Sequence, residues 1–289
     1  MPLEEAKIRA RQQWGQDPCG AAHGREHQFG TREFFDAVER HRYTEYAAWI
    51  PMVMGFDQFA GARLLEVGCG MGTDLLQFAR AGARCTGLDL TPRSIEITRQ
   101  HFAVYGESGD FLIADAEILP FADESYDVIY SNGVLLSTPD TEKAVREIHR
   151  VLRPGGTTKV MLYHRHSLHY WYRIIFRLGL CRGELLRGNS PGEIMSRYAE
   201  YSEHDGRPLV KVYSRKEVRA LFRLFSKVKV EIEQLNYMDL PVFVRAIPGI
   251  PQRLLPILRR TVGWNLIITA QKCLILSSFI MEFVSGFRV

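Results

Sequence analysis

The residues best suited to binding chemistry form a glycine-rich run, Glu66-Val67-Gly68-Cys69-Gly70-Met71-Gly72. Glycines at this spacing allow a tight turn and let a ligand approach the backbone closely. A plain tight turn and a dinucleotide site are the alternatives, but the dinucleotide fingerprint needs glycine where Thr73 stands. Glu66 and Asp74 flank the turn, and carboxylates beside a helix amino terminus repel a diphosphate. The run therefore predicts a site for a cationic ligand.

Further polar residues follow the next apolar segments. Asp89 stands 21 positions after Gly68, a spacing at which an acidic residue can accept hydrogen bonds from ribose hydroxyls. Its alternative role is to cap a helix that begins near Thr91. The pairs Asp115-Ala116 and Ser131-Asn132 end two later apolar runs. Because all these positions fall at carboxyl ends of predicted strands, we expect one ligand to contact them together.

The elements that would position these residues alternate along the middle of the chain. Compact apolar runs predict strands at 62–67, 84–90, 110–115, 126–132 and 157–164, and helical periodicity predicts helices at 73–81, 91–105 and 141–152. A capping box, Ser214 with Glu217, begins a helix over 214–225, and further strands are expected at 227–235 and 265–272. This alternation predicts an α/β fold with a mostly parallel, Rossmann-like sheet covered on both faces.

The rest of the chain divides into a helical amino-terminal cap (1–59), a main domain (60–272) with insertions at 165–213 and 236–263, and an apolar tail (273–289). The segment 30–46 is either an amphipathic helix packed on the core or a lid with Tyr43 as a ligand contact. The first insertion leaves the ligand edge of the sheet, so we expect it to cover the site. Its stretch 169–180 is predicted as a buried helix, as an apolar pocket wall, or as both.

Three histidines, His164, His166 and His169, follow the fifth predicted strand. Histidine titrates near neutrality, so His164 is the candidate general base, with a hydrogen-bonded loop histidine as the alternative. The spacing could also suit a metal, but no carboxylate partner lies near it in sequence, so no metal is predicted.

Composition narrows the class of protein. The 289 residues carry a formal net charge of +4, which gives no indication of a nucleic-acid partner. Five cysteines without a CxxC pair argue against a disulfide framework and a zinc site, and a cytoplasmic location is expected. The apolar tail is too short to span a membrane, so we expect it to pack on the protein, with peripheral membrane contact as the alternative.

The segments LLEVGCGMG, CTGLDLTP, DAEILPFADESYDVIYSNGVL, PDTEKAVREIHRVLRPGG and KVMLYHR, in this order, resemble the motifs of class I S-adenosylmethionine-dependent methyltransferases, especially the ubiquinone/menaquinone C-methyltransferase type. The resemblance covers residues 60–164 closely and 214–235 and 264–272 loosely. It implies a seven-stranded sheet whose last strand is antiparallel, with S-adenosylmethionine as the cofactor. That molecule carries an ammonium and a sulfonium but no phosphate, in keeping with the flanking carboxylates.

The resemblance also implies roles for individual residues. Asp89 would bind the ribose hydroxyls, and Asp115 would accept a hydrogen bond from the adenine amino group. Glu66 would contribute to binding the amino group in the methionine part of the cofactor. The full set implied to contact the cofactor is Glu66, Gly68, Gly70, Gly72, Asp89, Leu90, Asp115, Ala116, Ser131 and Asn132. One departure is Leu136, which stands where many relatives carry histidine.

These features predict a methyltransferase that acts on an O, C or N atom of a small, partly apolar molecule. An RNA or protein methyltransferase is the alternative enzyme, and it predicts a basic binding module or a motif such as NPPY where Ser131–Val134 stand. A non-catalytic S-adenosylmethionine-binding protein is a further alternative, which predicts decay of the cofactor motifs.

Overall fold

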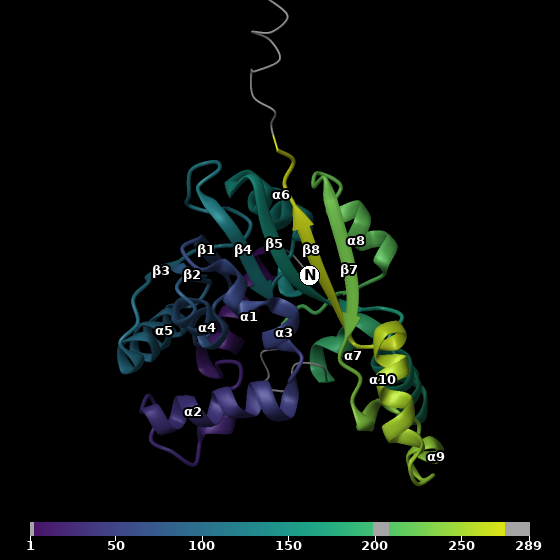
Figure 1. The fold of residues 1–289 in the computed structure, drawn as a ribbon. Helices are drawn as coiled ribbons and strands as arrows, with labels where there is room; N and C mark the ends of the chain where they lie inside the picture. Colours follow the sequence, from purple (N-terminus) through teal and green to yellow (C-terminus); the bar gives the residue numbers. More distant parts are fainter. Residues whose placement is uncertain (1–2, 199–207, 275–289) are drawn as a thin grey trace, which may run out of the picture.

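Eight strands form one mixed sheet in the computed structural model, which describes residues 3–198 and 208–274 (Figure 1). Along the sheet the order is β3-β2-β1-β4-β5-β8-β7, and β6 pairs with β5. Strand β8 runs antiparallel to both of its neighbours, and the other pairings are parallel. The bounds are β1 Arg63–Val67, β2 Arg84–Asp89, β3 Asp110–Ile113, β4 Tyr126–Asn132, β5 Leu152–His164, β6 Val212–Tyr213, β7 Lys227–Glu233 and β8 Asn265–Gln271.

The Rossmann-like class is confirmed, and the expected count of seven strands is wrong by one. The extra strand, β6, places Val212 and Tyr213 beside Tyr163 and His164 at the end of β5. Two residues are too few to show the alternation that identifies a strand in sequence, so β6 was not predictable.

Helices connect the parallel strands. Helices α4 (Thr73–Arg80) and α5 (Pro92–Tyr105) follow β1 and β2, whereas α6 (Thr141–Val151) joins β4 to β5. The strand order reverses direction between these two sets, so right-handed crossovers put α6 on the face opposite to α4 and α5. Thr91 caps α5 by accepting from the Ser94 N–H, and the predicted Ser214–Glu217 capping box begins α8 (Arg215–Leu221).

Short helices at the amino terminus cover the carboxyl ends of the parallel strands (Figure 1). They are α1 (Leu3–Gln16), a 3-10 turn (Ala21–Gly24), α2 (Arg32–Arg40), a π-helical turn (His41–Tyr46), α3 (Ile50–Met54) and a 3-10 turn (Phe56–Phe59). The predicted amphipathic helix is confirmed in α2, whose Phe34, Phe35 and Val38 pack against Met71 and Ile97. This contact fixes α2 over the glycine-rich turn.

The two insertions lie between β5 and α8 and between β7 and β8. The first contains the π-helix η5 (His169–Cys181), α7 (Pro191–Tyr198) and β6, and the second contains the 3-10 turn η6 (Tyr237–Asp239), α9 (Val242–Arg245) and α10 (Ile250–Val262). The expectation of a buried helix over 169–180 is wrong, because Trp171, Phe176 and Leu180 are exposed. The expectations that this stretch forms a pocket wall and that the first insertion covers the site are also wrong, because no described residue of 165–213 lines the cavity at the carboxyl ends of the strands. Within the described residues, no helix is long and apolar enough to cross a membrane. Most of the predicted tail, from residue 275 onward, lies outside the described residues.

Candidate active site

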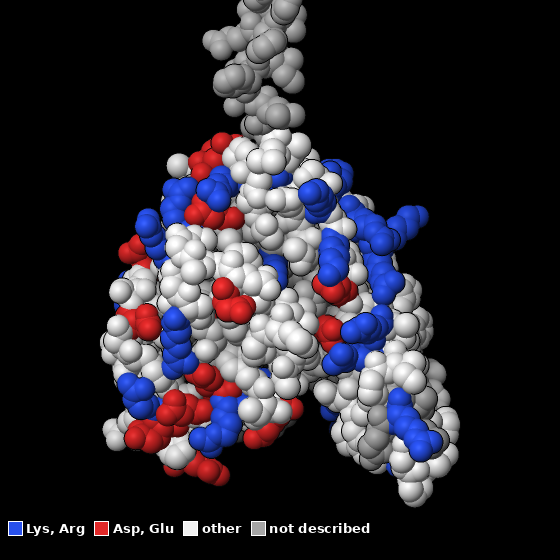
Figure 2. All heavy atoms as spheres, viewed as in Figure 1, with Lys and Arg blue, Asp and Glu red and all other residues white. Residues whose placement is uncertain are grey.

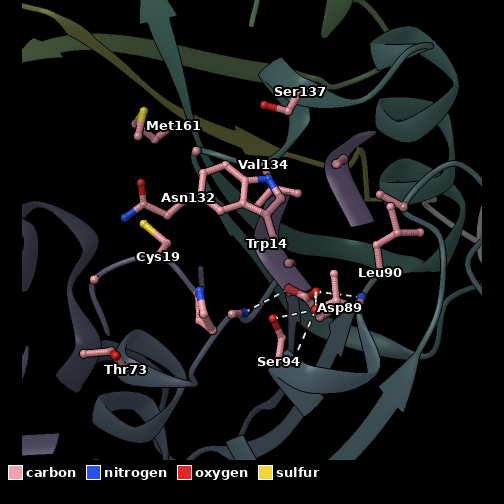
Figure 3. Close-up of a pocket in the computed structure, with 18 of the residues that line it drawn as sticks. Trp14, Cys19, Thr73, Asp89, Leu90, Ser94, Asn132, Val134, Ser137 and Met161 are labelled. Carbon is pink, nitrogen blue, oxygen red and sulfur yellow. Dashed lines mark hydrogen bonds between the residues drawn. The ribbon is translucent and has the colours of Figure 1, made fainter. Parts of the chain in front are cut away.

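A cavity of about 630 Å³ lies at the carboxyl ends of β1, β2 and β4, beneath the amino-terminal helices (Figure 3). Its volume falls in the range of small-molecule sites. The lining includes most of the residues that the sequence singled out: Gly68, Gly70, Asp89, Leu90, Asp115, Ala116 and Asn132. The parallel register of the strands brings these positions together, as expected from the order of the motifs.

Gly68, Gly70 and Gly72 of the turn all have positive φ angles, but the surroundings of Gly70 and Gly72 differ. A β-carbon at Gly70 would meet no atom within 4 Å, and Gly70 lines the cavity. A β-carbon at Gly72 would meet the Thr98 Cγ2 atom at 2.7 Å, so that glycine allows α4 and α5 to approach each other. Gly70 is therefore the glycine that keeps space open for a ligand.

We expect Gly70→Ala to weaken cofactor binding more than tenfold, because its methyl group would occupy the cavity. Gly106→Ala is the matched control, since Gly106 also has a positive φ and open space around a β-carbon but does not line the cavity. Both variants should lose roughly 1 kcal/mol of stability from the left-handed backbone. Calorimetry with S-adenosylhomocysteine measures the affinities, and equal affinities in the two variants would contradict this assignment.

Asp89 sits at the end of β2 with its carboxylate held from both sides. Its Oδ2 atom accepts from the Gly70 N–H at 3.0 Å, and its Oδ1 atom accepts from the Thr91 N–H at 2.9 Å and the Thr91 hydroxyl at 3.0 Å. Burial raises the pKa of Asp89, against the lowering effect of these hydrogen bonds. Asp89 therefore both supports the start of α5 and faces the cavity (Figure 3).

Asp115 is engaged by the amino-terminal helix, which the sequence did not indicate. The Lys7 Nζ atom lies 2.6 Å from Asp115 Oδ2 and 2.7 Å from Glu117 Oε2. Lys7 lines the cavity together with Trp14, whose indole projects into it from α1 (Figure 3). Nothing in the local sequence separates Lys7 from the other charged residues of this helix. The contact places α1 across the end of the cavity where the adenine was expected.

Asp74 is neutralised within a buried cluster. Arg42 donates to it from Nε at 2.6 Å and from Nη2, and the hydroxyls of Tyr43 and Tyr130 each donate at 2.7 Å. Asn132 adds a bond of 3.1 Å from Nδ2. Burial alone would raise the pKa of Asp74, but the Arg42 guanidinium and these hydrogen bonds lower it overall. The expectation that Asp74 itself repels a diphosphate is therefore wrong, because its charge is paired.

The remaining expected residues lie behind the cavity wall. Glu66 is buried, and its Oε2 atom has no hydrogen-bond partner among the described residues. Burial, reinforced by the nearby Asp74 charge, raises the pKa of Glu66 well above its usual range. Ser131 donates to the Val67 carbonyl at 2.9 Å and does not line the cavity. Tyr43 does not line it either. Its hydroxyl lies 2.7 Å from Asp74 Oδ1 and 3.1 Å from the carbonyl oxygen of Thr73, a residue that does line the cavity.

His164 does not face the cavity. Met161 and Tyr163 of β5 line it, and side chains alternate along a strand, so His164 points to the other face. There its Nδ1 atom lies 3.0 Å from the Gly263 carbonyl oxygen. The histidines that line the cavity are His23 and His41, whose rings stack with centroids 3.4 Å apart. Burial and the neighbouring His41 lower the pKa of His23, which favours its neutral form.

The cavity continues away from the glycine turn to a group of polar atoms that the sequence did not reveal. Asn265 donates from Nδ2 to Gln234 Oε1 at 2.7 Å, and both residues line the cavity. The Asn265 Oδ1 atom and the Trp49 Nε1 atom are buried and have no hydrogen-bond partner among the described residues. Gln234 also has φ of 64°, a backbone conformation that is uncommon for non-glycine residues. The two unpaired polar atoms thus belong to residues of the cavity wall but are themselves covered by neighbouring atoms.

Residues 65–159 match the family model of a methyltransferase domain. A sterol 4-C-methyltransferase of Caenorhabditis elegans is 39% identical over 94 residues, which are 32% of this chain and 28% of that protein. The methyltransferase GfsG of Streptomyces halstedii is 38% identical over 103 residues, 35% of this chain and 37% of that protein. The matches thus span about a third of the length of these curated relatives.

A solved S-adenosylmethionine-dependent methyltransferase from Methanosarcina mazei has the same fold. It superposes with a TM-score of 0.53 at 20% identity, over 78% of this chain and 98% of that chain. At this identity the likeness concerns the fold, whereas the family match covers the strands that carry the glycine turn, Asp89 and Asn132.

Proposed function

We propose that this chain, which carries a class I S-adenosylmethionine-dependent methyltransferase domain, transfers the methyl group of that cofactor to a small, partly apolar molecule. The observation that carries the proposal is the continuity of the cavity. It runs from Gly70 and Asp89 to Trp49, Gln234 and Asn265, so one continuous space has room for a donor and an acceptor. Both ends lie under the amino-terminal helices.

The residues of the donor end fit the cofactor. Gly70 leaves open space at the turn, and Asp89 and Asp115 offer carboxylate acceptors for ribose and adenine groups. Glu66, Gly72, Ser131 and Tyr43 do not line the cavity, so in this proposal they shape the glycine turn from behind and do not contact the cofactor.

The bound cofactor supplies a methyl group that its sulfonium has already activated for displacement. The chain then has to hold the acceptor in line with that methyl and exclude water, which can lower a barrier by about 7–11 kcal/mol. An acceptor that loses a proton also needs a base. The stacked pair His23 and His41 is placed for that role, because both rings line the cavity and His164 does not.

The acceptor end supports an apolar molecule with an oxygen-bearing polar group. Met161, Tyr163 and Ile50 provide apolar walls. Asn265 and Trp49 also line the cavity, and rotation of their side chains would uncover the buried Asn265 Oδ1 atom as an acceptor and the buried Trp49 Nε1 atom as a donor. A hydroxyl group can both donate and accept, so it can bond either atom. The relative named for a sterol substrate supports the same class of acceptor. A macromolecular acceptor would have to reach past the amino-terminal helices.

Incubation of metabolite extracts with methyl-labelled S-adenosylmethionine and the protein, read by mass spectrometry, tests the proposal. We expect labelled products of low mass that carry an oxygen. Asn265→Leu should lower kcat/KM for the methyl-accepting substrate more than tenfold, because the hydroxyl group of that substrate then has no hydrogen-bond partner. The affinity for the cofactor should stay unchanged. Labelled RNA or protein without a labelled small molecule would favour the alternative enzymes. Cofactor binding without any labelled product would favour a non-catalytic protein.

A further inference from the structure

The two insertions pack together into one projection, which we call the basic knob and define as residues 169–183 and 236–263. The His169 Nδ1 atom lies 2.8 Å from Asp239 Oδ1, and the Val242 N–H donates to the Tyr172 hydroxyl at 3.1 Å. In Figure 1, α9 and α10 extend well beyond the end of the sheet. The basic knob is therefore a built element that stands out from the body of the protein.

The surface of the basic knob is unusually apolar. Half of the large apolar side chains that are exposed in the described chain belong to it. Phe243 is 73% exposed, Ile257 69% and Trp171 53%. Soluble proteins rarely gather exposed apolar side chains in this way unless the surface binds a partner or a membrane.

The exposed charged residues of the basic knob are all basic. Arg173, Arg177, Arg253 and Arg260 are exposed on it. Asp239 is the only acidic residue of its sequence, and that side chain is buried against His169. On the face drawn in Figure 2, the projecting part accordingly shows blue Lys and Arg atoms among white atoms of residues that are neither acidic nor basic. Its partner must accept apolar side chains and arginines together.

We infer that the basic knob docks on the surface of an anionic lipid bilayer. Apolar and aromatic side chains bury themselves at the boundary between headgroups and acyl chains, and the arginines bind anionic headgroups. A second copy of the chain fits less well, because a symmetric contact would bring the arginines of one knob against those of the other. The arginines of the basic knob thus favour a negatively charged membrane over a second copy of the chain as the partner.

The position of the basic knob gives this docking a consequence. The segment 236–263 begins just after Gln234 and ends just before Asn265, and both of those residues line the cavity. Docking would bring the acceptor end of the cavity close to the bilayer, from which an apolar acceptor could enter. This consequence depends on the proposed function, whereas the docking itself does not.

Sedimentation of the full chain with phosphatidylcholine vesicles, with and without about one third phosphatidylglycerol, tests the docking. We expect binding to the anionic vesicles that weakens as salt is raised. The double variant Phe243→Ser and Ile257→Ser should bind at least about tenfold more weakly, because two apolar side chains no longer enter the bilayer. Met52→Ser is the matched control, since Met52 is 77% exposed on α3, outside the basic knob. Arg173→Glu with Arg177→Glu should reduce binding to the anionic vesicles alone.

Several outcomes would overturn the inference. They are wild-type protein that stays in solution, equal binding to neutral and anionic vesicles, and a Phe243→Ser and Ile257→Ser variant that binds as tightly as wild type. The last result would place the contact elsewhere, for example in the tail. Sedimentation velocity without lipid would identify a second copy as the occupant if the double variant dissociates a dimer. Circular dichroism checks that each variant is folded, and none of these measurements depends on methyl transfer.

Discussion

Asp89→Ala should lower the affinity for S-adenosylmethionine about a hundredfold, which corresponds to the loss of roughly 3 kcal/mol. A carboxylate that accepts from two ribose hydroxyls makes charge-assisted hydrogen bonds worth about 1.5–3 kcal/mol each. Asp89 is well placed for this, because it lines the cavity and is oriented by the N–H groups of Gly70 and Thr91. Calorimetry with S-adenosylmethionine and with NADH measures the change and tests the dinucleotide alternative.

Asp127→Ala is the matched control for Asp89→Ala. Asp127 also accepts a backbone bond, from the Arg63 N–H at 2.7 Å, but it lies at the amino end of β4 and does not line the cavity. Both variants should be destabilised by about 1–3 kcal/mol from lost backbone hydrogen bonds. Only Asp89→Ala should also lose ligand affinity. Unchanged affinity in that variant would remove the ribose assignment, and tight binding of NADH alone would reject the cofactor.

Arg42→Met should destabilise the protein by roughly 3–5 kcal/mol, the usual cost of leaving one partner of a buried ion pair alone. Asp74 has a side chain that is only 2% exposed, and Arg42 supplies its one positive partner among the described residues. Thermal or denaturant unfolding measures the loss. Adding Asp74→Asn to Arg42→Met should recover a large part of it, because the uncompensated buried charge is removed. An Arg42→Met variant as stable as wild type would show that the pair contributes nothing.

The same pair gives a pH dependence with a definite sign. The pKa of Asp74 is lowered in the folded protein, so its contribution to stability is present above the ordinary value of 3.8. The contribution is lost as the pH falls through the lowered pKa. In Arg42→Met, burial without the opposing guanidinium should raise the pKa of Asp74. As the pH falls, Asp74 is therefore protonated in the variant before it is protonated in the wild type, and this removes the unpaired buried charge of the variant. The stability gap between wild type and Arg42→Met should therefore narrow as the pH falls from neutrality, and a constant gap would contradict the charge argument.

Part of the site was predictable because it depends on local sequence. Strand periodicity, helix caps and the glycine turn are set by residues a few positions apart, and β4 begins and ends where its pattern predicted. Given parallel strands, the carboxyl ends meet at one edge, which brought Asp89, Asp115 and Asn132 to one cavity. The prediction for His164 failed on a different point. The sequence located the end of β5 but not which face of the strand turns to the cavity.

Sequence alone determined the alternation of strands and helices, the order of the cofactor motifs and the residues at the strand ends, since each follows from neighbours along the chain. Tertiary structure decided which distant groups meet there. Lys7 contacts Asp115 across 108 positions, Arg42 neutralises Asp74, and Gln234 meets Asn265 on either side of an insertion. The physical reason is that ion pairing and burial depend on distances in space, which the packing of the whole chain sets.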